Sequence, residues 1–229
     1  MIKKFINKKS IFNIILFAVY CLFLAFLMEY LFRGNWENVS DFLHHFFKAF
    51  LYNALIISVT LSPCFLFKRR LFAFSLGSLI WIILGIANNF LIKFRETPLT
   101  FADLRMIKSG IELSEQYLSK NSIMLIASLF IVLIIVLSFI FFKCKKVKVK
   151  YIINIPLIFI YFLFFSKLIN YGLKNNIISK NFWDVNWGYN TYGFSYSFYN
   201  SAVNTGMSKP NNYSKRTISN IKDELAMLD

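Results

Sequence analysis

Long apolar runs that alternate with short basic segments form the dominant pattern along this chain. An α-helix rises about 1.5 Å per residue, so each run can cross or nearly cross a hydrocarbon core of about 30 Å. An odd number of spans places the two ends of the chain on opposite sides of the membrane. We therefore predict an all-α polytopic membrane protein with five transmembrane helices, at about residues 11–32, 49–67, 71–92, 123–142 and 152–171.

The basic residues between the apolar runs predict the orientation. Segments 1–10, 68–70 and 143–150 are rich in lysine and arginine, and short loops of this kind stay in the cytoplasm. The loop 93–122 is balanced, because it contains five basic and four acidic residues. We therefore predict that the N-terminus is inside, that residues 1–172 form the membrane domain, and that residues 173–229 form an extracellular linker.

The overall composition agrees with a membrane protein. Hydrophobic residues make up 57% of the chain and the mean hydropathy is +0.55, which is typical of polytopic membrane proteins. The net charge of +15 does not indicate nucleic-acid binding, because twelve of the 26 basic residues lie in the three inside segments. Membrane insertion and anionic lipid explain those charges. We expect membrane lipid as a partner and no nucleic acid.

The residue types needed for catalysis do not occur in a recognisable arrangement. The sequence has no Gly-rich phosphate loop, no zinc-protease motif and no nucleophile elbow. Cys21, Cys64 and Cys144 are predicted to be unpaired and to act as small apolar residues. His44 and His45 have no Cys, Asp or Glu at ligand spacing. We therefore predict no catalytic residue, no metal site and no cofactor in this chain.

The outer loop contains several signals for short helices. Thr97-Pro98 is expected to end the third span, Thr100 and Asp103 form a potential capping box, and Gly110 can end the helix that they begin. This predicts a helix over residues 101–109 that lies flat on the outer surface, followed by a second helical stretch over residues 111–118.

Polar residues in the spans and in this loop suggest a lipid site. Those in the spans all lie toward the predicted outer leaflet, and such residues often line a wet cavity. Ordinary interface anchoring and a Glu29–Arg33 pair are the alternative. The residues in the spans are Glu29, His44, His45, Lys48, Asn53, Asn88, Asn89, Lys167 and Asn170. Five basic residues are our candidates for binding an anionic headgroup: Arg95, Arg105 and Lys108 in the loop, and Lys48 and Lys167 in the spans.

The region after the fifth span is aromatic and then amphipathic. Residues 181–200 contain three Phe, four Tyr and two Trp. This high density of aromatic side chains favours an aromatic belt at the membrane interface over a surface on which sugars or glycerol polymers stack. Ser214 can cap a terminal helix whose apolar stripe needs a partner.

Two segments carry a resemblance to a known family. Residues 92–104 read I-K-F-R-E-T-P-L-T-F-A-D-L and match the pattern K-x-R-x-x-P-L-x-x-x-D-L. Tyr192-Gly193-Phe194, followed by S-K-P-N-N-Y-S over residues 208–214, matches a G-F/L segment that precedes K-P-x-x-Y-S. Over nearly its whole length the chain resembles the N-terminal membrane domain of the lipoteichoic acid synthase and phosphoglycerol transferase family.

The resemblance implies five helices in a bacterial plasma membrane and an outward, sulfatase-like catalytic domain. That domain uses a threonine nucleophile and a divalent metal, usually manganese, to move glycerol phosphate from phosphatidylglycerol onto a polymer or glycolipid. It would begin where this sequence stops, at Asp229, so none of its site residues is carried over. We expect a membrane domain that anchors a catalytic domain and presents lipid to it. The alternatives are an accessory subunit or small transporter for lipid or envelope polymer, and a structural anchor.

Reporter fusions test the predicted topology. An extracellular reporter is expected to be active after Ser109 or Asp229, and a cytoplasmic reporter after Arg70 or Lys146, because the basic loops stay inside. Activity of the cytoplasmic reporter at Asp229 would contradict the five-span prediction.

Overall fold

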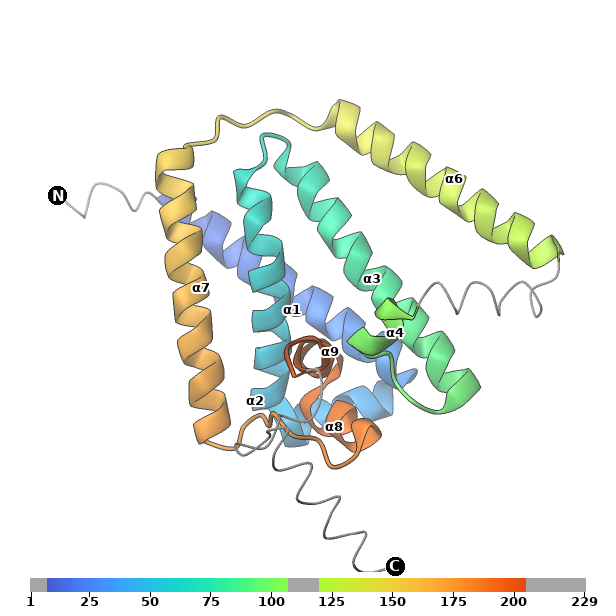
Figure 1. Cartoon of the computed structure of the whole chain (residues 1–229). Helices are drawn as coiled ribbons and strands as arrows, with labels where there is room; N and C mark the ends of the chain where they lie inside the picture. Colours follow the sequence, from blue (N-terminus) through green and yellow to red (C-terminus); the bar gives the residue numbers. More distant parts are fainter. Residues whose placement is uncertain (1–7, 107–119, 205–229) are drawn as a thin grey trace, which may run out of the picture.

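The computed structural model describes residues 8–106 and 120–204, and every regular element within those residues is a helix (Figure 1). The predicted all-α class is therefore confirmed. In chain order the elements are α1 (Lys8–Arg33), α2 (Trp36–Leu61), the 3-10 helix η2 (Ser62–Leu66), α3 (Arg70–Arg95), α4 (Phe101–Arg105), α6 (Lys120–Lys143), α7 (Tyr151–Lys174), α8 (Val185–Tyr192) and α9 (Phe194–Val203).

Four of these helices are long and apolar enough to cross a membrane. They are Phe12–Arg33 in α1, Trp36–Leu66 in α2 and η2, Arg70–Arg95 in α3, and Tyr151–Lys174 in α7. The remaining predicted span, residues 123–142, corresponds to α6, in which Val132–Lys143 is described as a shorter apolar helix. In Figure 1, α6 stands apart from the other helices and approaches α3 at one end, where the Phe141 and Phe72 rings lie 5.0 Å apart. The count of five and the orientation stay predictions.

The turn between α1 and α2 makes the second helix longer than its apolar run. Gly34, with φ of 76°, follows the end of α1, and Asn35 then caps α2 by accepting a hydrogen bond from the Asn38 N–H at 2.9 Å. The helix therefore begins at Trp36 and not near residue 49, as the apolar run predicted. It bends at Phe46, where φ is −124° and ψ is 33°.

Helices α1, α2 and α3 form the centre of the structure. The Tyr20 and Ser78 hydroxyls lie 2.5 Å apart between α1 and α3, and the Trp81 indole N–H donates to the Thr60 hydroxyl at 2.9 Å between α3 and α2. These pairs satisfy polar groups that would otherwise be stranded among apolar side chains. The three cysteines are buried and free, as predicted: Cys21, Cys64 and Cys144.

The segment after α7 folds back into the bundle. Figure 1 shows α9 end-on among the longer helices, with α8 beside it. The Phe198 ring lies 6.4 Å from the Trp81 ring, which belongs to the middle of α3. The interpretation of residues 181–200 as an exposed aromatic belt is therefore wrong for most of the rings, because this segment forms part of the core. Trp183 is exposed, whereas five rings are buried: Tyr189, Tyr192, Phe194, Tyr196 and Phe198.

Candidate functional site: a clamped turn beside a polar cavity

Helices α8 and α9 meet at Gly193, and two side chains from the long helices hold this turn. Glu29 of α1 is fully buried, and its Oε1 accepts a hydrogen bond from the Phe194 N–H at 2.8 Å. Phe194 is the first residue of α9, so its N–H is one of the donors that a helix cannot satisfy internally. A carboxylate here also faces the positive end of the helix dipole.

Asn53 of α2 holds the same turn from a second helix. Its Oδ1 accepts from the Tyr196 N–H at 2.8 Å, and its Nδ2 donates to the Tyr192 carbonyl at 2.7 Å and to a carbonyl within α2. The amide thus joins the last residue of α8 to the third residue of α9, with both of its hydrogens used. We call Glu29, Asn53 and Gly193 the α8–α9 clamp.

Gly193 is the residue that the clamp requires at this turn. Its φ of 84° and ψ of 167° lie in a region that is essentially restricted to glycine. A Cβ atom at this position would lie closer than 3.0 Å to Asn53 Nδ2 and Glu29 Oε1. Both the backbone conformation and the close approach of the two side chains therefore exclude larger residues.

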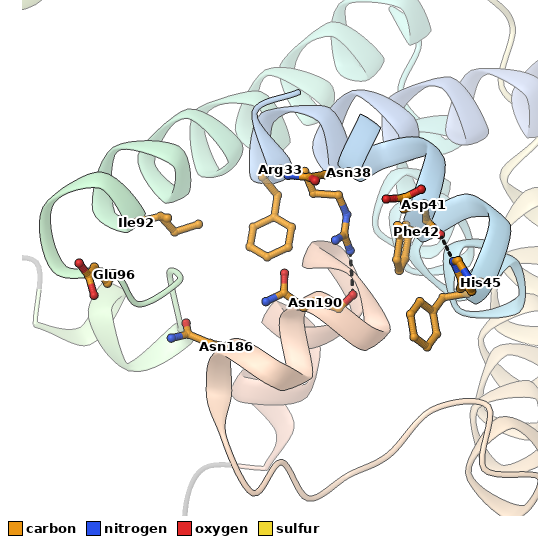
Figure 2. A pocket seen from close by; sticks show the side chains of 11 residues that line it. Arg33, Asn38, Asp41, Phe42, His45, Ile92, Glu96, Asn186 and Asn190 are labelled. Carbon is orange, nitrogen blue, oxygen red and sulfur yellow. Dashed lines mark hydrogen bonds between the residues drawn. The ribbon is translucent and has the colours of Figure 1, made fainter. Parts of the chain in front are cut away.

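Arg33 links the clamp to α8. Its Nε donates to Glu29 Oε2 at 3.2 Å, and its Nη2 donates to the Asn190 carbonyl at 2.9 Å (Figure 2). The guanidinium carbon lies 4.0 Å from the centre of the Phe42 ring, which is a cation–π distance. The predicted Glu29–Arg33 pair is therefore confirmed, and it balances the buried carboxylate.

A cavity of about 620 Å³ lies beside Arg33, where α1, α2, α3 and α8 approach one another. Figure 2 shows Arg33 pointing toward α8, with side chains of α2 on one side and of α3 on the other. Rings of Phe32, Phe42 and Phe46 form part of the wall. The remaining polar lining comes from Asn38, Asp41, His45, Glu96, Asn186 and Asn190.

The cavity offers many hydrogen-bonding groups but little positive charge. Arg33 is compensated by the Glu29 carboxylate, and the lining contains two further carboxylates, Asp41 and Glu96. Amides and carboxylates bind hydroxyl groups well, and a few polar groups beside apolar walls are typical of ligand sites. This lining suits a neutral, hydroxyl-rich group such as glycerol or a sugar better than an isolated anion.

A two-point ion pair closes the loop after α3. Arg95 Nη1 and Nη2 donate to the two Asp103 carboxylate oxygens at 2.6 and 2.7 Å, a strong arrangement. Asp103 Oδ2 also accepts from the Thr100 N–H at 2.7 Å, so the predicted capping box is confirmed. Burial raises the pKa of Asp103, but hydrogen bonds from Arg95 and Thr100 outweigh it and hold that pKa at about 2.

The same loop is fastened to α8 and α9. The Leu99 N–H donates to Asn88 Oδ1 at 2.7 Å, and the Tyr189 hydroxyl donates to the Leu99 carbonyl at 2.6 Å. The Phe101 N–H donates to the Ser201 hydroxyl at 2.9 Å. Residues 92–104 and 192–194, which carry part of the family resemblance, therefore lie in one hydrogen-bonded network with the long helices.

The basic loop residues predicted to bind lipid have different surroundings. Arg95 is occupied by Asp103. Arg105 is exposed, with its guanidinium 5.3 Å from the Phe101 ring centre. Lys108 lies outside the described residues. Neither Arg95 nor Arg105 lines the polar cavity, and their role in lipid binding stays a prediction.

Lys48 and Lys167 form a separate pair of candidates. Both are exposed, on α2 and α7, close to the place where the Tyr52 hydroxyl donates to the Leu168 carbonyl at 3.0 Å. Figure 1 shows α7 on the opposite side of α8 and α9 from α3 and α4. The described candidates are thus spread around this end of the molecule and do not converge on one site.

Four of the nine polar side chains predicted to face an open pocket are instead bonded to other segments of the protein. Glu29, Asn53 and Asn88 are buried, and Asn89 donates to the Leu31 carbonyl at 2.7 Å. The physical reason is that these side chains satisfy backbone groups of other segments. The predicted helix over residues 101–109 is present as α4 (Phe101–Arg105), and the predicted stretch 111–118 and the terminal helix capped by Ser214 lie outside the described residues.

Sequence reasoning missed the contribution of α8 to the cavity. Asp184 caps this helix by accepting from the Trp187 N–H at 2.7 Å, and Gly193 ends it. An Asp before the helix and a Gly after it are readable signals. They place Asn186 and Asn190, four residues apart, on one face.

Comparison with protein-family models, curated proteins and solved structures finds no match to this chain. Within residues 8–106 and 120–204, no three His, Cys, Asp or Glu side chains are grouped as metal ligands. The assignment to a lipoteichoic acid synthase-like family therefore rests on the sequence motifs.

Replacing Gly193 tests the clamp. Gly193→Ala is expected to release α8 and α9, because the added Cβ would lie closer than 3.0 Å to Asn53 Nδ2 and Glu29 Oε1, in addition to the backbone strain of about 1–3 kcal/mol. A cysteine placed at the buried Ser197 position, in a background without the native cysteines, should then react with a water-soluble maleimide. The matched control is Gly34→Ala, which also has positive φ but no atom within 4 Å of the added Cβ. Equal labelling in the two variants would contradict the clamp.

Asp103→Asn tests the ion pair through pH. The pKa of Asp103 is lower in the folded chain than its ordinary value of 3.8, so the ionised carboxylate stabilises the fold at pH values above 3.8. This contribution is lost as the pH falls through about 2. The thermal midpoint in detergent should therefore be lower in the variant at pH 7, and the difference should vanish near pH 2. Asp184→Asn is the control, because asparagine caps a helix about as well as aspartate. A difference that persists at pH 2 would rule out the ion pair as its cause.

Proposed function

We propose that this chain is the membrane domain of a lipoteichoic acid synthase-like phosphoglycerol transferase in a bacterial plasma membrane. In this role it anchors an outward sulfatase-like catalytic domain and holds a glycerol-containing headgroup near it. The observation that carries the proposal is the α8–α9 clamp, together with the polar cavity beside it.

The clamp supports an anchoring role because it fixes the segment that follows the last long helix. Glu29 and Asn53 hold the turn at Gly193, and Leu99 and Ser201 tie the outer loop to the same unit. An enzyme that acts on a lipid headgroup gains rate when its reacting groups are held at a fixed position. A domain attached beyond α9 would start from such a position.

The polar cavity supports a headgroup role. Its amides and carboxylates suit the hydroxyl groups of glycerol, and its volume of about 620 Å³ lies in the range of small-molecule sites. The exposed side chains of Arg105, Lys48 and Lys167 place positive charge at the same end of the molecule, where it favours phosphate. We propose that glycerol hydroxyls enter the cavity while these side chains attract the phosphate from outside.

Reconstitution in phosphatidylglycerol vesicles tests this function. The isolated chain is expected to release no diacylglycerol, with or without manganese, because phosphoryl transfer of this kind depends on a metal ion to stabilise charge. The chain joined after Asp229 to a sulfatase-like catalytic domain should release diacylglycerol and transfer glycerol phosphate. Metal-dependent release by the isolated chain, above a mock purification, would overturn the proposed division of labour.

The clamp variants provide the control for this experiment. Gly193→Ala in the joined protein should lower transfer from vesicles at least tenfold, because the domain loses its fixed position. Hydrolysis of a water-soluble glycerol phosphodiester by the same protein should be unchanged. Gly34→Ala should leave both reactions intact. Equal vesicle activity in the two variants would contradict a positioning role for α8 and α9.

A further inference from the structure

A second cavity, of about 740 Å³, lies between α1, α2 and α7 and extends along α2 from Leu51 to Ser62. Its polar lining is gathered where α1 and α7 begin and α2 ends: Asn13, Ser62, Arg70 and Asn154. Its deeper lining is mainly apolar and includes Phe17, Ala18, Leu22, Leu51 and Leu55. We call this cavity the Arg70 groove.

The groove is about one leaflet deep. From Asn13 to Leu22 the α1 helix rises about 14 Å, which is close to half of a hydrocarbon core of about 30 Å. Polar groups therefore lie at headgroup depth and apolar groups at acyl-chain depth. The polar pair that lies deeper, Ser58 and Tyr161, is satisfied internally, with the two hydroxyls 2.6 Å apart. This gradient matches a phospholipid with its chain between the helices.

Arg70 forms no ion pair within the part of the chain that the structure describes. Its Nε is buried and has no hydrogen-bond partner among the described residues, whereas the neighbouring Arg69 donates to the Phe141 carbonyl. A buried donor without an acceptor is costly. The sequence offers no carboxylate at this end, because residues 8–28, 42–95 and 116–183 contain no Asp or Glu. Among the described residues, no carboxylate is therefore available to Arg70.

The charge balance selects the kind of lipid. The basic residues around this end include Lys68, Arg69, Lys148 and Lys150. A zwitterionic lipid would add an ammonium group where no carboxylate is present to pair with it. An anionic glycerophospholipid adds only the phosphate and neutral hydroxyls, which Arg70 and Asn154 can bind as donors.

We propose that the Arg70 groove binds one anionic glycerophospholipid from the leaflet at this end of the bundle. The phosphate accepts hydrogen bonds from Arg70, and one acyl chain lies between α1, α2 and α7. This inference is independent of the proposed function, since the polar end of the groove is formed by Asn13, Ser62, Arg70 and Asn154, none of which belongs to the α8–α9 clamp or the polar cavity.

Native mass spectrometry of the chain from nanodiscs with equal phosphatidylglycerol and phosphatidylcholine tests the proposal. The parent should retain one phosphatidylglycerol in preference to phosphatidylcholine. Arg70→Gln should weaken that retention about tenfold, the scale of a lost charge-assisted hydrogen bond. Ala18→Trp, which fills the groove from its exposed wall, should displace the same lipid.

Two controls separate a specific site from general effects. Lys146→Gln removes an exposed charge at the same end, and Val19→Trp adds the same bulk next to Ala18 but outside the groove. Both should retain the lipid as the parent does. Unchanged retention in Arg70→Gln or in Ala18→Trp would overturn the proposal. Displacement of the lipid by millimolar inorganic phosphate would also overturn it, because the site would then bind free phosphate. If Arg70→Gln fails to fold, the comparison of Ala18→Trp with Val19→Trp decides the question.

Discussion

A backbone turn that lies among apolar helices needs partners for its N–H and C=O groups, because hydrocarbon supplies none. The turn between α8 and α9 meets this constraint through Glu29 and Asn53, which satisfy the first residues of α9 and the end of α8. The cost of burying a carboxylate is offset by Arg33, which binds the second oxygen of Glu29. Gly193 is required because any larger residue would separate these groups.

The polar network at this end of the molecule extends from that turn. With α8 held in place, the Tyr189 hydroxyl donates to the Leu99 carbonyl, and Asn88 accepts from the N–H of the same residue. The Arg95–Asp103 pair then closes the loop. The polar cavity is a consequence of the same docking, since Asn186 and Asn190 reach it only when α8 lies against α1 and α2. A function in headgroup binding therefore depends on the clamp as much as on the cavity lining.

The two ends of the molecule differ in charge: the clamp end carries both acidic and basic residues, whereas the described residues of the other end are basic without acidic partners. The described acidic residues lie near the clamp and the polar cavity, whereas the end that begins α1 and α7 has basic residues without any carboxylate. The first end suits neutral hydroxyl groups, and the second suits phosphate. A membrane protein with this polarity can contact the lipids of both leaflets through different parts of their headgroups.

The sequence by itself determined the features that depend on neighbouring residues. Apolar runs predicted the α-helical class, because a helix satisfies its own backbone wherever it crosses hydrocarbon. The Glu29–Arg33 pair and the capping box at Thr100 were also readable, since their partners are three or four residues apart. The predicted start of the second helix was less accurate, because the apolar run begins near residue 49 whereas the Asn35 cap starts α2 at Trp36.

Only the tertiary structure decided what the buried polar groups bind. Glu29 accepts from the Phe194 N–H, 165 residues later in the sequence, and Asn53 accepts from the Tyr196 N–H, 143 residues later. The hydrophobic pattern carries no information about pairs so far apart in sequence. The composition of the aromatic segment 181–200 suits a membrane interface and a protein core equally well. In the structure the segment packs against α1, α2 and α3, so most of its rings are buried in the core. Arg95 could face lipid or Asp103 by sequence, and the fold of the loop placed the carboxylate within hydrogen-bonding distance.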